Sequence, residues 1–134
     1  RRALDRSHII IYFDTLKYLA KGGRIGRAQG LLGAVLSIKP ILTVKEGEMS
    51  PVTRLRSQMA GMDYLYNFAT SFPHIEAVAV EHTTLPDEAD KLADRLSVSV
   101  PKERIQRSTV SPVLGVYAGP NAVAVTVLES EGHS

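Results

Sequence analysis

One hairpin signal limits the folds that this chain can adopt. Two runs rich in β-branched and aliphatic residues, Ile38–Val44 and Met49–Arg54, flank the tetrapeptide KEGE, in which Gly47 can supply the positive φ of a tight turn. A short turn of this kind joins antiparallel strands, so the sheet that contains them cannot be wholly parallel. Each run also holds a proline, which cannot donate to the ladder, and we therefore expect an unpaired edge or a bulge in both.

Strand and helix patterns alternate along the rest of the chain without a regular βαβ repeat. β-Branched and alternating runs predict strands over Ile9–Phe13, Ile75–Val80, Ile105–Val110 and Ala122–Leu128. Apolar residues at helical spacing predict helices over Thr15–Lys21, Arg24–Leu36, Leu55–Phe72 and Asp87–Leu96. A chain of 134 residues has the usual size of one domain. We therefore expect a single α/β (α+β-like) domain, residues 1–134, with helices packed on a mixed β-sheet.

Cap and turn residues predict several boundaries. Asp14 is predicted to cap the first helix, and Gly22 is predicted to end it in the left-handed conformation. Ser111 followed by Pro112 predicts a short helical turn. The tetrapeptide GPNA, residues 119–122, predicts a type II turn in which Asn121 adopts a positive φ.

Five glycines fall within the twelve residues Gly22–Gly33, although glycine is costly inside regular structure. No Gly-Lys-Ser/Thr phosphate loop is present, and a predicted helix separates the segment from the preceding strand, unlike a dinucleotide-binding loop. In the helix predicted here, Gly26, Gly30 and Gly33 share one face. Such a face fits either close packing against another backbone or a channel for a ligand.

Arg24 opens the same segment, beside backbone N–H groups. A guanidinium in this position can bind a carboxylate or a phosphate, or it can be an ordinary surface arginine. We group Arg24, Gly26, Gly30 and Leu31 as candidate ligand contacts.

An apolar stripe at helical spacing runs through Met59, Met62, Leu65 and Phe68. A stripe of this kind usually belongs to a core. Methionine adapts to irregular apolar space, so the same stripe can also line an acyl-chain cavity. Met59 and Met62 therefore join the candidate ligand contacts.

Composition narrows the classes of function. The chain has no cysteine, which excludes disulfides and thiolate chemistry and fits a cytoplasmic protein, and no apolar run is long enough to span a membrane. Residues 1–56 hold eleven Lys or Arg and four Asp or Glu, about +7, whereas residues 57–134 hold five and ten, about −5. The basic part can face an anionic partner or form a solvated surface. Nucleic acid is not an expected partner, because the arginines are not interleaved with stacking aromatic residues.

No catalytic or metal-binding pattern is visible. The four histidines, His8, His74, His82 and His133, are not spaced like helical metal ligands. The pair Glu81-His82 ends a predicted strand and can be considered for acid–base chemistry, but polar residues at strand ends are usually solvated. We therefore expect a chain that is not an enzyme and that uses no metal or cofactor.

Three blocks of sequence carry a resemblance to a known family. They are DTLKYLAKGGRIGRAQGLLGAVLSIKPIL, KEGEMSPVTRLRS and SPVLGVYAGPNAVAV. Together they resemble the C-terminal domain of the DegV family of bacterial fatty-acid-binding proteins, from Ile9 to about Leu128. The resemblance implies a protein of two α/β domains with a long-chain fatty acid between them, of which this chain lacks the N-terminal domain.

In that family the carboxylate of the fatty acid is bound mainly by Thr and Ser side chains of the N-terminal domain. The acyl chain enters an apolar pocket associated with the C-terminal domain, and some members present the acid to a kinase that makes acyl phosphate for phospholipid synthesis. The resemblance thus implies three partners for this chain: a long-chain fatty acid, the N-terminal domain and a fatty-acid kinase.

Individual residues take expected roles from the resemblance. Arg24 matches the arginine of the family's GGRI motif near the ligand entrance, and Arg56 matches an arginine in the region that contacts the kinase. Tyr117 and Asn121 stand where the motif HxGPG has its His and its last Gly. The His helps to hold the carboxylate, whereas a Tyr hydroxyl donates one hydrogen bond and carries no positive charge. Tyr117 is therefore a candidate ligand contact, and Arg56 is a candidate partner contact.

Two other classes of function stay open beside fatty-acid binding. One is a small hydrolase or transferase domain that uses Glu81-His82 or Tyr117. The other is a structural or interaction module with a basic end.

Overall fold

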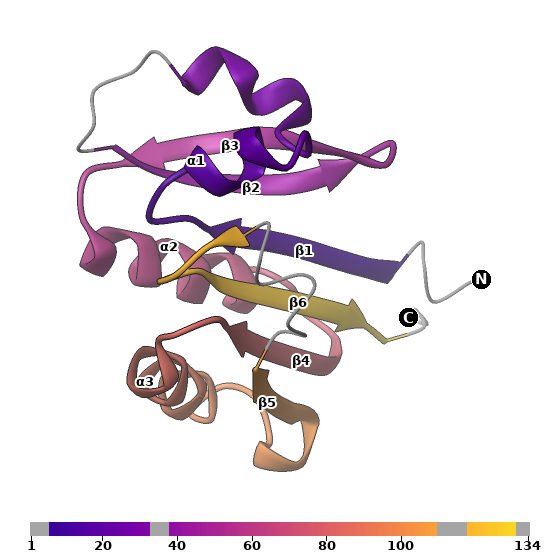
Figure 1. The fold of residues 1–134 in the computed structure, drawn as a ribbon. Helices are drawn as coiled ribbons and strands as arrows, with labels where there is room; N and C mark the ends of the chain where they lie inside the picture. The colour runs from indigo at the N-terminus through magenta and orange to yellow at the C-terminus, as the bar shows by residue number, and fades with distance from the viewer. Residues whose placement is uncertain (1–5, 33–37, 110–117, 131–134) are drawn as a thin grey trace.

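A six-stranded mixed β-sheet organises the domain in the computed structural model, which describes residues 6–32, 38–109 and 118–130 (Figure 1). The strand order across the sheet is β3-β2-β1-β6-β4-β5. The strands are β1 (Ser7–Tyr12), β2 (Lys39–Lys45), β3 (Glu48–Leu55), β4 (Ile75–His82), β5 (Ile105–Thr109) and β6 (Val123–Glu129). Only the β4–β5 pair among them is parallel, so the predicted mixed sheet is confirmed.

Helical segments cover both faces of this sheet, on different parts of it. The segments are α1 (Lys17–Lys21), the 3-10 helix η2 (Gly26–Leu31), α2 (Gln58–Thr70), α3 (Pro86–Leu96) and the 3-10 helix η3 (Lys102–Arg104). In Figure 1, α2 passes behind the sheet and α1 lies in front of it. The sheet therefore separates two cores.

The large core lies between the sheet and α2 and α3. Because side chains alternate along a strand, β1, β4 and β6 each send every second residue to this face. The strand residues include Ile10, Tyr12, Val78, Val80, Val123, Val125 and Val127, and the helices add Met62, Leu65, Ala69, Ala89, Leu92, Ala93 and Leu96. Gly61 of α2 packs directly on the ring of Tyr12, with no room for a Cβ between them.

The small core lies on the opposite face, under α1 and η2. Its buried members are Phe13, Leu16, Leu19, Ile25, Ala28 and Leu42, with Leu31 and Met49 half-buried against them. Phe13 follows Tyr12 in the chain and points to the other side of the sheet, as strand alternation requires.

The predicted hairpin is confirmed as β2 and β3. Glu46 and Gly47 in its turn have φ of 53° and 79°. The pairing register shifts between Ile41 and Leu42, because Leu42 pairs with Pro51 and leaves Val52 of β3 without a partner. A proline cannot donate to the ladder, so a bulge beside it on the edge strand agrees with the expectation.

The first helix ends at Lys21 as predicted, but its predicted start and its left-handed residue were wrong. Asp14 does not cap it, since α1 begins at Lys17 after Leu16 and has no side-chain cap. The Asp14 carboxylate instead pairs with Lys39 Nζ at 2.9 Å. The left-handed residue is Gly23, with φ 71°, whereas Gly22 has φ −86°. The reversal of the chain thus comes one residue later than predicted.

The helix predicted over residues 24–36 is replaced, within the described residues, by the short 3-10 helix η2. Gly26 has φ 56°, which an α-helix interior cannot contain. A Cβ on Gly26 would lie 2.9 Å from the backbone oxygen of Met49, so here the backbones approach closely. Gly30 has open space around it, so close packing explains Gly26 but not Gly30. Gly33 lies outside the described residues.

The long helix predicted over residues 55–72 is confirmed as α2, with a later start. Strand β3 continues through Leu55, and Ser57 caps the helix by accepting a hydrogen bond from the Ala60 N–H at 3.0 Å. A hydroxyl at this position satisfies a backbone donor that the helix leaves unpaired. Val110 and the helical turn predicted at Ser111-Pro112 lie outside the described residues.

Candidate functional site

An apolar pocket of about 180 Å³ lies on the small-core face of the sheet. Its floor is formed by Ile9, Ile11 and Phe13, which alternate along and just beyond β1, and by Ala124 of β6. Ala124 pairs directly with Ile11, so the floor is continuous across the two strands.

The rest of the apolar lining comes from four other segments. Leu19 of α1, Met49 at the start of β3 and Ala118 all line it, together with Val44 of β2. Gly26 fixes the distance between η2 and Met49, because its backbone contacts that of Met49. The pocket thus lies between the sheet and α1, and η2 packs beside it against Met49.

The space in the pocket comes from a size alternation along β6. In the segment AVAVTVL the residues Val123, Val125 and Val127 are fully buried in the large core. Their neighbours Ala122 and Ala124 face the pocket and are too small to fill it. This alternation of Val with Ala is the signal in the sequence that indicates the pocket.

Two polar side chains stand on the β4 side of the pocket. Glu81 pairs across the sheet with Ala124 and lines the pocket, and its Oε2 accepts a long hydrogen bond of 3.5 Å from Ser108 Oγ. Thr83 also lines the pocket, and its Oγ1 accepts a hydrogen bond from the Ala122 N–H at 3.0 Å. The rest of the lining is apolar.

The GPNA turn closes one end of the pocket wall. Asn121 has φ 61°, as predicted, and its N–H donates to Thr84 Oγ1 at 2.8 Å. The Thr84 hydroxyl donates in turn to Asn121 Oδ1 at 3.0 Å. Gly119, with φ 79°, packs on the ring of Tyr18. The turn is therefore attached to both β4 and α1, and it holds Ala118 and Ala122 in the lining.

A polar cluster at the same end of the sheet surrounds Asp14. Besides its ion pair with Lys39, the Asp14 carboxylate lies 3.5 Å from Asn121 Nδ2. Burial raises the pKa of the nearby Tyr12 hydroxyl, and the negative charge of Asp14 raises it further. Tyr12 therefore stays neutral at physiological pH.

None of the candidate ligand contacts chosen from the sequence lines this pocket among the described residues. Arg24 is exposed, and its Nη1 donates to the Gly22 carbonyl oxygen at 3.3 Å. Gly26 and Leu31 lie in η2, where Leu31 packs against the small core. Gly30 is exposed beside them. Tyr117 lies outside the described residues.

Met59 and Met62 lie on the other side of the sheet, so the structure does not bring them together with Arg24 and Gly26. Met62 is buried in the large core, whereas Met59 is 76% exposed. Both line an open groove of about 500 Å³ between α2 and α3. Arg56 is exposed one turn before Met59, between β3 and α2.

The pair Glu81-His82 cannot act as one acid–base unit. Consecutive strand residues point to opposite faces, so Glu81 faces the pocket while His82 turns toward the large core. His82 Nδ1 is buried and has no hydrogen-bond partner among the described residues. His8 lies elsewhere, stacked on Phe72 and bonded to Glu129 at 2.8 Å. His133 lies outside the described residues.

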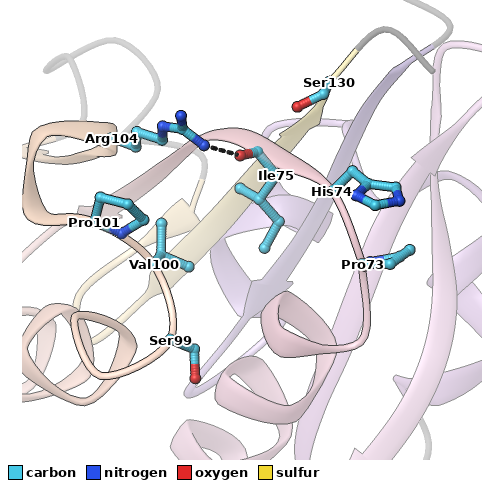
Figure 2. A pocket seen from close by; sticks show the side chains of 8 residues that line it. All are labelled: Pro73, His74, Ile75, Ser99, Val100, Pro101, Arg104 and Ser130. Carbon is cyan, nitrogen blue, oxygen red and sulfur yellow. Dashed lines mark hydrogen bonds between the residues drawn. The ribbon is translucent and has the colours of Figure 1, made fainter. Parts of the chain in front are cut away.

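A second, more polar pocket of about 230 Å³ lies at the far end of β4 (Figure 2). Arg104 Nη1 donates to the carbonyl oxygen of Ile75 at 3.1 Å, so its guanidinium is engaged with the backbone. His74 and Ser99 stand apart in Figure 2, with their polar ends on different sides of the pocket. Because these polar groups do not converge, this pocket is a weaker candidate site than the apolar one.

Within the described ranges 6–32, 38–109 and 118–130, no cluster of three or more His, Asp or Glu side chains could hold a metal ion. The helices in those ranges include none that is long and apolar enough to cross a membrane.

Comparison with known proteins finds one matching family model and related sequences. The family model described as "Uncharacterised protein, DegV family" matches residues 1–130. A DegV domain-containing protein of Streptomyces coelicolor is 39% identical over 119 residues, which cover 87% of this chain and 42% of that protein.

Solved structures share the fold. A fatty acid binding DegV family protein of Streptococcus agalactiae superposes with a TM-score of 0.86 at 23% identity, over 96% of this chain and 47% of that one. A structure described as fatty acid binding of a DegV family protein, from Thermus thermophilus, gives 0.80 at 25% identity, over 94% and 46%. The chain thus spans less than half the length of each of these proteins.

Proposed function

The chain belongs to the DegV family, and from this membership we propose that it binds a long-chain fatty acid whose acyl chain lies in the apolar pocket between the sheet and the α1–η2 segment. The observation that carries the proposal is the lining of the pocket, which is apolar except for Glu81 and Thr83. The Thermus thermophilus relative, described as binding a fatty acid, supports the same ligand class.

The pocket is large enough for part of an acyl chain only. Sites for small molecules usually have volumes of roughly 300–1,000 Å³, above the 180 Å³ found here. We propose that these residues form the C-terminal half of a two-domain protein, and that the N-terminal domain completes the site. The coverage of less than half of each relative supports this arrangement.

Burial of the acyl chain supplies most of the binding free energy in this proposal. About fourteen buried methylenes contribute roughly 11 kcal/mol gross at about 0.8 kcal/mol each, before the entropy lost on binding is subtracted. Polar groups then orient the acid. Arg24, two residues before η2, and Tyr117 are the residues that we assign to the headgroup.

Lipid extraction of the protein in its natural full length tests the proposal. Mass spectrometry of the extract is expected to find a co-purified long-chain fatty acid, and a delipidated sample is expected to bind an added one. Absence of both would overturn fatty-acid binding and leave the interaction module as the better description. Hydrolase or transferase activity is not expected, and assays with acyl esters would show it if it were present.

We further propose that a fatty-acid kinase contacts the protein around Arg56. Arg56 and Met59 are both exposed at the N-terminal end of α2, where a charged and an apolar side chain offer a contact to another protein. This surface lies on the opposite side of the sheet from the apolar pocket.

Replacing Arg56 with Glu is expected to weaken acyl-phosphate formation by the kinase by about tenfold or more, while fatty-acid affinity stays within about twofold. Charge reversal at a contact acts on association with the partner, not on the distant apolar pocket. Coupled kinase assays and fatty-acid titration measure the two effects. Arg54→Glu, the same change on an exposed arginine of β3, serves as the matched control. Loss of both activities in Arg56→Glu would contradict the role proposed for Arg56.

A further inference from the structure

Glu81 is the only ionisable side chain among the described residues that line the apolar pocket. It projects from β4 on the pocket face, opposite Ala124, which is in turn opposite Ile11 of the floor. Its contact with Ser108 Oγ at 3.5 Å is a long hydrogen bond, and no Lys or Arg of the described residues forms an ion pair with it. The β4 side of the pocket therefore carries a negative charge that is not offset by a cation in the part of the chain that the structure describes.

The opposite side of the pocket lies under a positively charged segment. Residues 15–32, which include α1 and η2, contain four Lys or Arg and no Asp or Glu. Arg27 is paired with Glu46 at 2.6 Å, so its charge is largely offset. Lys17 and Lys21 remain as exposed cations on this segment. An anion at the pocket is thus attracted toward the α1–η2 segment and repelled from β4.

We propose that Glu81 fixes the direction in which a fatty acid binds, with the carboxylate on the α1–η2 side and the uncharged chain beside Glu81. This inference rests on the proposed function. Repulsion between two carboxylates grows as water is excluded from between them. A fatty acid that binds with its carboxylate beside Glu81 is therefore disfavoured. A dicarboxylic acid of the same chain length has no uncharged end to place beside Glu81, and the pocket rejects it.

Titration of the natural full-length protein with hexadecanoic and hexadecanedioic acid tests this inference. The wild type is expected to bind the monocarboxylic acid more tightly by about a hundredfold, since the second carboxylate meets both an apolar lining and Glu81. In Glu81→Gln, which keeps the shape and removes the charge, the preference is expected to fall by about tenfold. In Glu81→Lys, which can pair with the second carboxylate, it is expected to fall further.

The outcomes separate this inference from the function on which it rests. Hexadecanoic acid is expected to remain a measurable ligand of Glu81→Gln and Glu81→Lys, so that the preference between the two acids can be determined in each variant. A preference that is the same in wild type, Glu81→Gln and Glu81→Lys would overturn the role of Glu81 and leave fatty-acid binding intact. Failure of every protein, wild type included, to bind hexadecanoic acid would overturn fatty-acid binding itself, and this inference with it.

Discussion

Replacing Ala124 with Phe is expected to weaken fatty-acid binding by about a hundredfold and to leave the protein folded. Ala124 is in the centre of the pocket floor, and its side chain points into the space that the acyl chain is proposed to occupy. A phenyl ring there excludes three or four methylenes, about 3 kcal/mol at about 0.8 kcal/mol each. Titration with a long-chain fatty acid measures the loss, and thermal unfolding without ligand shows that the fold is intact.

Two further variants make this result specific. Ala124→Val, a smaller addition, is expected to weaken binding by less than Ala124→Phe does. Ala77→Phe makes the same change on the same face of the sheet, on β4 and outside the pocket lining, and is expected to bind normally. Normal binding by Ala124→Phe would place the acyl chain elsewhere.

Replacing Gly61 with Ala is expected to lower the free energy of unfolding by about 2 kcal/mol, although alanine favours a helix over glycine by about 1 kcal/mol. A Cβ on Gly61 would overlap the ring of Tyr12. Tyr12 is fully buried in the large core, so its ring has no free space into which to move. Overpacking therefore outweighs the gain in helix propensity. Chemical denaturation, read as a lower midpoint at unchanged slope, measures the effect.

Gly30→Ala is the matched control for that change. A Cβ on Gly30 meets nothing within 4 Å, and its φ is not in the left-handed region. Its replacement by Ala is therefore expected to be neutral or to stabilise the protein by a few tenths of a kcal/mol or more, through the unfolded state. If both variants had the same stability as the wild type, the packing of α2 on Tyr12 would be looser than the structure indicates.

Local patterns in the sequence were enough to predict most of the fold. The hairpin, α2 and the strand Val123–Glu129 can each be predicted from the residues of that one segment, without the rest of the chain. The positive φ of Asn121 also follows from turn chemistry within four residues. These features need no information about the rest of the chain.

Features that depend on distant segments could not be predicted in this way. The sequence neighbours of Asp14 are typical of a helix cap, whereas its carboxylate pairs with Lys39, 25 positions away. Gly26 looked helical because its contact with Met49 is not visible in local sequence. Tertiary contacts overrode local propensity at both positions.

The apolar pocket could not be located from the sequence for a related reason. Arg24 and Met59 are candidate ligand contacts by residue type, but the sheet places them on opposite sides. The space in the pocket is left by three small residues, Ala118, Ala122 and Ala124, which do not stand out in a sequence. Which face of β6 holds the alanines is decided by the pairing of β6 with β1 and β4, a long-range property.

The position of a bromine atom in a bound fatty acid tests the central claim most directly. A crystal of the natural full-length protein with a long-chain acid brominated in its chain would show that atom by anomalous scattering. The account predicts a peak between the sheet and the α1–η2 segment, beside Ala124 and Leu19. A peak in the groove between α2 and α3, beside Met59 and Met62, would contradict it.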